Sequence, residues 1–291
     1  MKIKFANLII NSQSQRLRVS DFKYQVGYTK EDMDSVRGLR TRTAKLLSQA
    51  ASTKLSLTLE NTPSLYKALT VCMLKGYDET NAVYYPLDSH IIDATQLATV
   101  DVQFIEDDSK HRFANGYVDY VRFNFNSMSF PTVDLDIYYP QVPATITEIS
   151  DLQPEMPILP VNISVKYALW VEGVLSSYSP IQASEFIFDI KQSIEPIIGK
   201  NGLVSSMYST EFTSIVNLTC QSTYANIFEN AYYNKQDVSL LIDWVLNDQQ
   251  VRYIFPRLSI TDMSKINNYG IISIELTPNA INYVPLQAKI V

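Results

Sequence analysis

Two pairs of carboxylates are the strongest candidates for chemistry in this chain of 291 residues. Asp134 and Asp136 alternate along a strand-like segment, so both side chains would lie on one face, and Asp107 directly precedes Asp108. A pair of carboxylates can share the acid and base roles of glycoside hydrolysis. Such pairs are also common on solvated strands. A glycosidase that uses Asp134 and Asp136 is therefore the least favoured hypothesis, and we predict no catalytic residue.

Residue types that hold metals and cofactors are sparse. His90 and His111 are the two histidines, and neither has Cys or His at the spacing of a metal-ligand pair. The eight glycines form no phosphate-binding loop and no Gly-x-Ser-x-Gly motif. Cys72 and Cys220 lie in apolar surroundings and are predicted to be small core residues. We therefore expect no metal, no cofactor and no enzymatic activity.

The composition narrows the class of protein further. The net charge of −6 disfavours a protein that holds nucleic acid by neutralising phosphates, although DNA could still pass such a surface without binding. Residues 1–5 lack the apolar core of a signal peptide, and no apolar run reaches the length of a membrane helix. The sequence predicts synthesis and folding in a cytoplasm, with no membrane span.

The segments that carry these residues recur along the chain. Similar segments lie 161 to 164 residues apart in the first part of each copy and 135 or 136 apart afterwards, so the first copy would carry about 25 extra residues between Gly76 and Val100. A tandem duplication with one insertion explains this order, and chance similarity among short strands is the alternative. The matched segments are 2–6 with 164–168, 20–24 with 184–188, Gly38 with Gly199, 57–58 with 218–219, Thr62 with Thr223, 101–102 with 237–238, and 122–124 with 257–259.

Alternating apolar and polar residues dominate both copies. In residues 54–60 the leucines fall on one face and Lys, Ser, Thr and Glu on the other, which is typical of a strand with one buried face. One helix is expected in each copy. The first has Thr62 as N-cap, Pro63 next, and Leu65, Leu69 and Cys72 on one face, and closes at Gly76. The second begins at Thr223 and carries Ile227, Phe228 and Ala231.

The predicted fold is mainly β, with two tandem copies of a small antiparallel β-barrel or sandwich, each with one short α-helix. Residues 1–140 form the first unit, with an insertion at about 77–99, and residues 161–291 form the second. Each unit is large enough for its own core. Residues 141–160 are proline-rich and form a semi-rigid, extended linker.

The connection between the second and third strands differs between the copies. In the first copy this loop is rich in both charges, and in the second it is nearly uncharged. We predict two different contact surfaces, with ordinary solvated loops as the alternative. The candidate contact residues are Lys30, Arg37, Gly38, Arg40 and Arg42 in the first loop and Gly199 and Gly202 in the second.

A strand pair joined by a long loop, one short helix and a meander of strands, without a catalytic motif, resembles the tail-tube superfamily of bacteriophages and injection systems. Members usually carry one such unit and stack as six-fold rings. The resemblance implies that three copies of a two-unit chain close a pseudo-hexameric ring, in which strands of neighbouring units join into one inner barrel. It also implies that the loops at 29–51 and 195–209 reach the adjacent ring.

The resemblance predicts a structural virion protein, a duplicated tail-tube unit that forms a trimeric ring or stacked tube for DNA ejection. Its partners would be other copies of itself, other phage tail or baseplate proteins, and DNA that passes the lumen without specific binding. It would be located in the virion tail after assembly in the host cytoplasm. The insertion at 77–99 would be an outer decoration or a contact to another virion component.

Two alternatives remain open. A baseplate or distal-tail ring protein of the same fold would form a single ring rather than a polymer. A carbohydrate-binding or adhesin module would also account for the strands and for the 19 tyrosines, whose rings suit interfaces, and it would be a monomer with affinity for glycans.

Overall fold

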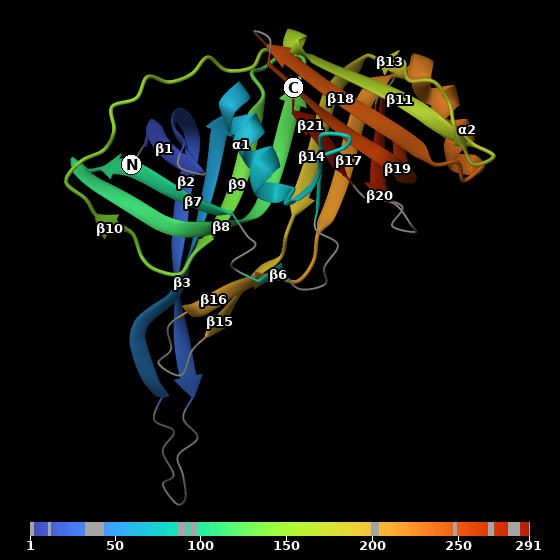
Figure 1. Cartoon of the computed structure of the whole chain (residues 1–291). Coiled ribbons are helices and arrows are strands. Elements are labelled where there is room, and N and C mark those ends of the chain that lie inside the picture. The colour runs from blue at the N-terminus through green and yellow to red at the C-terminus, as the bar shows by residue number, and fades with distance from the viewer. Residues whose placement is uncertain are drawn as a thin grey trace, which may run out of the picture.

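The computed structural model describes residues 3–10, 13–32, 44–86, 92–93, 98–198, 204–246, 249–266, 271–278 and 286–290. Strands dominate these residues, as the alternating sequence predicts (Figure 1). Two α-helices occur among them, α1 (Pro63–Met73) and α2 (Ala225–Tyr233). The mainly β class and the presence of one short α-helix in each half are confirmed.

Six strands form a closed antiparallel barrel, called here the first barrel. Their pairing runs in a circle through β2, β1, β7, β8, β9 and β3 and back to β2. Closure pairs the backbone groups of all six strands and removes their exposed edges where the circle is complete. The strands are β1 (Phe5–Ile10), β2 (Gln13–Asp32), β3 (Ala44–Glu60), β7 (Thr99–Glu106), β8 (Ser109–Asn126) and β9 (Thr132–Tyr139).

Seven later strands, called here the second strand set, pair in the same order. The series runs β13, β11, β18, β19, β20, β17, β14, and only Gln182 separates β13 from β14 in the chain. These two strands together therefore take the position that β2 has in the first barrel. The set comprises β11 (Ile163–Val171), β13 (Ser179–Ile181), β14 (Ala183–Lys191), β17 (Thr213–Gln221), β18 (Val238–Leu246), β19 (Gln249–Ile266) and β20 (Ile271–Pro278).

The two groups of strands also share their irregularities. A bulge interrupts the pairing at three corresponding places. At the first, the serine at the centre of the bulge donates its hydroxyl to a neighbouring strand, Ser20 to the carbonyl of Thr58 and Ser184 to that of Thr219, both at 3.2 Å. The bulges lie at Val19/Asp21 and Ala183/Glu185, at Val100/Val102 and Val238/Leu240, and at Val118/Tyr120 and Ile260/Asp262.

These bulges agree with the predicted match of residues 20–24 with 184–188 and correct the match of Arg122 with Arg257. Residues 20–24 and 184–188 do occupy corresponding positions. Further along, the bulges set Asn115 rather than Arg122 at the position of Arg257. The β18–β19 hairpin is longer than the β7–β8 hairpin, because the paired residues Leu240 and Phe255 lie 15 residues apart and the corresponding Val102 and Phe113 lie 11 apart. Hairpin length therefore shifts the match, since the bulges themselves are common to both halves.

The helix ends differ from the prediction in detail. Thr62 is the N-cap of α1, and its hydroxyl accepts a hydrogen bond from the amide of Leu65 at 3.3 Å. The helix ends at Met73, before Gly76, because Gly76 already pairs with Tyr85 in the next hairpin. In the second half, Thr223 lies in the 3₁₀ turn η2 (Ser222–Tyr224), and α2 begins only at Ala225, since no proline follows Thr223 to start an α-helix there.

Short strands connect the two halves of the chain. The insertion contributes β4 (Gly76–Asp78), β5 (Val83–Tyr85) and β6 (Ile92–Asp93). β5 pairs with β21 (Gln287–Ile290), which also pairs with β19, and β6 pairs with β16. The described part of the insertion therefore contacts the second half of its own chain. The other short elements are β10 (Ala144–Thr145), β12 (Val174–Leu175), β15 (Ile194–Ile198), β16 (Val204–Ser209) and η1 (Pro160–Asn162).

The proline-rich linker runs extended along the first barrel (Figure 1). β10 pairs with β8, and the side chain of Asn7 donates a hydrogen bond to the carbonyl of Ser150 at 2.8 Å. Arg16 forms an ion pair with Asp151 at 2.7 Å, and Ile158 is fully buried. The linker is thus held to the barrel by backbone pairing, polar contacts and one apolar anchor.

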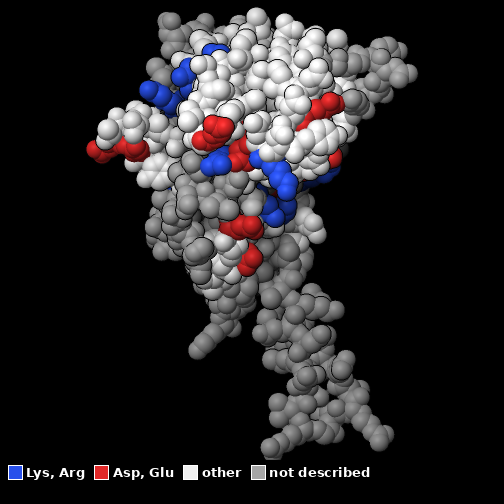
Figure 2. All heavy atoms as spheres, turned by 90° about the vertical axis from the view of Figure 1, so that its right-hand side faces the viewer, with Lys and Arg blue, Asp and Glu red and all other residues white. Residues whose placement is uncertain are grey.

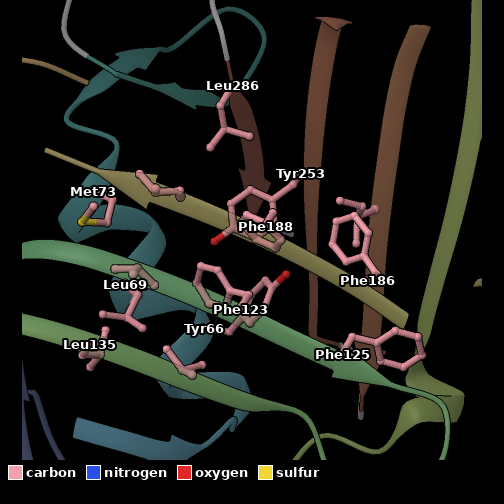
Figure 3. Close-up of a cluster of buried hydrophobic side chains, with 14 of the residues drawn as sticks. Tyr66, Leu69, Met73, Phe123, Phe125, Leu135, Phe186, Phe188, Tyr253 and Leu286 are labelled. Atoms are coloured by element: carbon pink, nitrogen blue, oxygen red, sulfur yellow. The ribbon is translucent and has the colours of Figure 1, made fainter. Parts of the chain in front are cut away.

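Buried side chains of both halves form one continuous core instead of two separate ones (Figure 3). Tyr66 on α1 is the centre of this contact. Its ring centroid lies 4.8 Å from Phe123 of β8, 5.1 Å from Trp244 of β18 and 5.1 Å from Tyr253 of β19. Helix α1 therefore packs between the first barrel and the second strand set.

We expect Tyr66→Ala to lower the free energy of unfolding by about 3–5 kcal/mol, because it leaves a cavity at this shared core. Urea unfolding followed by tryptophan fluorescence measures the change. Tyr233→Ala on α2 is the matched control, since that ring is 76% exposed and its removal should cost less than about 0.5 kcal/mol. Equal losses in the two variants would contradict a central role for Tyr66.

Candidate functional site

Eight strands form one continuous sheet across both halves of the chain. Their order is β2, β3, β9, β8, β14, β17, β20, β19. The halves meet where β8 pairs with β14, from Glu185 opposite Asn126 to Lys191 opposite Tyr120. We call this pairing the intrachain joint. One side of the sheet packs on the core, and we call the other side the polar face.

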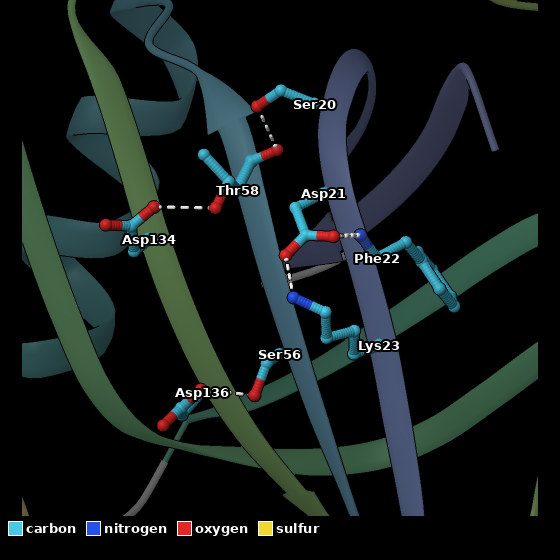
Figure 4. A network of polar contacts seen from close by, with 8 residues as sticks. All are labelled: Ser20, Asp21, Phe22, Lys23, Ser56, Thr58, Asp134 and Asp136. Atoms are coloured by element: carbon cyan, nitrogen blue, oxygen red, sulfur yellow. Dashed lines mark hydrogen bonds and ion pairs between the residues drawn. The ribbon is translucent and has the colours of Figure 1, made fainter. Parts of the chain in front are cut away.

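Cross-strand hydrogen bonds order the polar face in the first half (Figure 4). Thr58 donates its hydroxyl to Asp134 at 2.7 Å, and Ser56 donates its hydroxyl to Asp136 at 2.6 Å. The second oxygen of Asp134 accepts a bond from the side-chain amide of Asn124 at 2.8 Å. Neighbouring strands thus occupy both oxygens of Asp134, the best carboxylate candidate for catalysis.

Two lysines on this face are paired as well. Lys54 lies 2.7 Å from the second oxygen of Asp136, and Lys23 lies 2.5 Å from Asp21. Burial lowers the pKa of Lys54, but the hydrogen bond to Asp136 and the nearby charges of Asp136, Tyr138 and Asp119 together outweigh this effect, so its pKa is raised overall. The pKa of Asp21 is lowered by its bond to Lys23. Both shifts favour the charged forms of Lys54 and Asp21.

The intrachain joint combines an ion pair on the polar face with aromatic stacking on the core side. Arg122 donates two hydrogen bonds to Asp189, from Nε at 2.8 Å and from Nη2 at 2.9 Å. This contact is the largest reason that the pKa of Arg122 is raised. On the core side, the rings of Phe123 and Phe188 stack with centroids 4.5 Å apart. The two-pronged geometry fixes the register of β8 against β14.

Asp119 lies at the bulge where β8 leaves the first barrel for this joint. It is 7% exposed, its side chain accepts the amide of Ile194 at 2.7 Å, and its carbonyl accepts the amide of Gln192 at 2.8 Å. Burial raises the pKa of Asp119, although the bond from Ile194 and the charges of Lys54 and Lys191 oppose this. Asp119 and the Arg122–Asp189 pair were not predicted from the sequence, because alternation alone does not show which strands become neighbours.

The predicted contact loops are described only at their bases. Lys30 lies in β2 opposite Leu46, and Ile198 pairs with Val204 at the end of the β15–β16 hairpin. Both hairpins project from the same side of the molecule (Figure 1). The remaining candidates lie outside the described residues, and their contact role stays a prediction: Arg37, Gly38, Arg40, Arg42, Gly199 and Gly202.

Other candidates from the sequence have structural roles. Asp107 and Asp108 have positive φ angles of 47° and 63° and form the turn between β7 and β8. The ring of His111 stacks on Phe104 with centroids 5.3 Å apart, and His90 lies outside the described residues. Cys72 and Cys220 are buried, which raises the pKa of each thiol to about 12.

Within the described ranges, no group of three or more His, Cys, Asp or Glu side chains could hold a metal ion. None of the helices in this part of the chain is long and apolar enough to cross a membrane. Acidic and basic side chains are intermixed on the face shown in Figure 2, without a continuous basic patch among its coloured residues. No family model and no curated protein matches this sequence. The similarity to tail-tube proteins therefore stays a prediction.

We expect Asp119→Ala to be less stable than Asp119→Asn by about 1–3 kcal/mol, because only Asn keeps an oxygen acceptor for the amide of Ile194. Both variants remove the charge, so their difference isolates the hydrogen bond. Chemical unfolding of the two variants at pH 7 measures it, and equal stabilities would contradict a structural role for this bond.

The pH dependence gives a separate test of the buried charge. Because the pKa of Asp119 is raised in the folded state, its contribution to stability is complete below the ordinary pKa of Asp and decreases as the pH rises through the raised value. The stability of Asp119→Asn relative to the natural protein should therefore increase from acid to neutral pH. A difference that does not vary with pH would contradict the raised pKa.

Proposed function

We propose that this chain is a structural virion protein, a duplicated tail-tube unit whose copies close a trimeric, pseudo-hexameric ring or stacked tube that conducts phage DNA. The observation that carries the proposal is the eight-stranded sheet, which has an unpaired edge at each end. Among the described strands, β2 from Ser20 onward pairs only with β3, and β19 after Leu258 pairs only with β20. Long free edges favour pairing with another chain.

In a tandem duplication, the two free edges correspond to the two strands that pair at the intrachain joint. The same strand order and three corresponding bulges in both halves support a common origin of the two units. If the units are equivalent, the intrachain joint has a counterpart between the β19 edge of one copy and the β2 edge of the next. Such a head-to-tail contact repeats until the ring closes. Three chains would then supply six units.

The charge arrangement of the polar face suits a channel that DNA passes. A surface that binds DNA needs cations free to contact phosphates. Here Lys23, Lys54 and Arg122 are each paired with a carboxylate of the same face. The paired cations and the net charge of −6 support passage without specific binding.

Light scattering with negative-stain microscopy tests this function. We expect the purified protein to reach the mass of three chains and to form rings, or tubes built from them. Single rings without tubes would favour the baseplate or distal-tail alternative. A monomer that persists as the concentration rises would contradict the proposal and favour the carbohydrate-binding alternative, for which a glycan screen is the next measurement.

A further inference from the structure

We propose that neighbouring copies join by pairing the β2 edge with the β19 edge in the register of the intrachain joint, with Gln25 opposite Ser264 and Val26 opposite Met263. We further propose that this joint lacks the ion pair that fixes the joint inside the chain. The inference rests on the ring proposed above. It adds the partner strand, the register and the chemistry of the contact.

Gln25 in β2 takes the position that Asp189 has in β14. Phe22 lies opposite Leu57 in the first barrel, and Phe186 lies opposite Leu218 in the second strand set. Each phenylalanine follows its bulge by the same number of residues, so β2 and β14 correspond residue by residue. Three residues after each phenylalanine come Gln25 and Asp189.

Ser264 in β19 takes the position that Arg122 has in β8. Tyr120 lies opposite Asp136 directly after the bulge in β8, and Asp262 lies opposite Glu275 directly after the matching bulge in β19. Two residues further along come Arg122 and Ser264. The Asp189–Arg122 pair inside the chain therefore corresponds to Gln25 of one copy and Ser264 of the next.

Both edges are accessible for this contact. Gln25 and Ser264 are exposed, and Val26 and Met263 are only partly buried. Tyr24, at the position of Phe188, is 40% exposed, whereas Phe188 inside the intrachain joint is 1% exposed. We expect this difference in exposure if the β2 edge forms the same kind of joint but still lacks its second strand. An apolar ring at such an edge stays in contact with water until another strand covers it.

The chemistry of the two joints differs. Inside the chain, Arg122 and Asp189 form a two-pronged ion pair next to stacked phenylalanines. Between copies, the corresponding Gln25 and Ser264 are neutral. Backbone hydrogen bonds and apolar contacts such as Val26 with Met263 would hold the copies together. Gln25 and Ser264 therefore add no ion pair that salt could weaken at this position.

Disulfide trapping tests the register. In a paired antiparallel register the Cα atoms of opposite residues are about 4.5–5.5 Å apart, which a disulfide can bridge. We expect Gln25→Cys/Ser264→Cys to form covalent species that end at three chains after oxidation. The native Cys72 and Cys220 are buried and should not contribute. The single variants and Gln25→Cys/Met263→Cys, whose second thiol points to the opposite face, are controls that should not cross-link.

The outcomes separate the register from the function. Rings without the cross-link, or with an equal cross-link in the Met263→Cys control, would overturn the register and leave the ring standing. Monomers without any cross-link would overturn both the register and the ring. Covalent trimers in the Ser264→Cys pair alone support both.

Moving the ion pair provides an independent test. Gln25→Asp/Ser264→Arg places the charges of Asp189 and Arg122 at the contact between copies. We expect half-assembly at a concentration roughly two- to five-fold lower than for the natural protein, and a new sensitivity to salt. The single variants should assemble no better than the natural protein. A double variant that assembles no better than the single variants would overturn the register.

Discussion

The structure depends on strand β8, which belongs both to the first barrel and to the sheet that joins the two halves. The first half of β8 pairs with β7 inside the first barrel, and its second half leaves β7 and pairs with β14. A strand can change partners in this way only if its backbone turns without leaving buried amides unpaired. The bulge at Asp119 does this, because its carbonyl and carboxylate accept the amides of Gln192 and Ile194. Thr261 takes the corresponding place in β19, where the described residues supply no second strand.

This change of partner explains why the two halves share a core. Once β8 and β14 are neighbours, their core-facing phenylalanines stack, and α1 is enclosed between the halves. Tyr66 then contacts β8, β18 and β19 together. Domains with separate cores usually meet through a more polar interface and are joined by a flexible linker. The linker here is instead fixed to the first barrel, and the buried contact between halves is aromatic.

Local sequence patterns predicted the strands and helices better than they predicted which strands pair and which residues correspond. The leucines of β3 and the Thr62-Pro63 start of α1 were predictable because alternation and capping depend on near neighbours. The match of Ser20 with Ser184 was predictable for the same reason. The match of Arg122 with Arg257 was wrong because the β18–β19 hairpin is longer than the β7–β8 hairpin, which no local pattern shows. The Arg122–Asp189 pair lies 67 residues apart in sequence and depends on which strands meet, so no local pattern indicates it.

The proposed channel and the proposed joint between copies place different demands on corresponding positions of the two halves. A lining that DNA passes must keep its cations paired, and Arg122 satisfies this by binding Asp189. A joint between copies must stay open until assembly, and an Arg or Asp without its partner at the two positions of the ion pair would attract other ligands in the meantime. Neutral Gln25 and Ser264 avoid this cost. The chain would therefore keep the ion pair where the joint forms on folding and omit it where the joint forms on assembly.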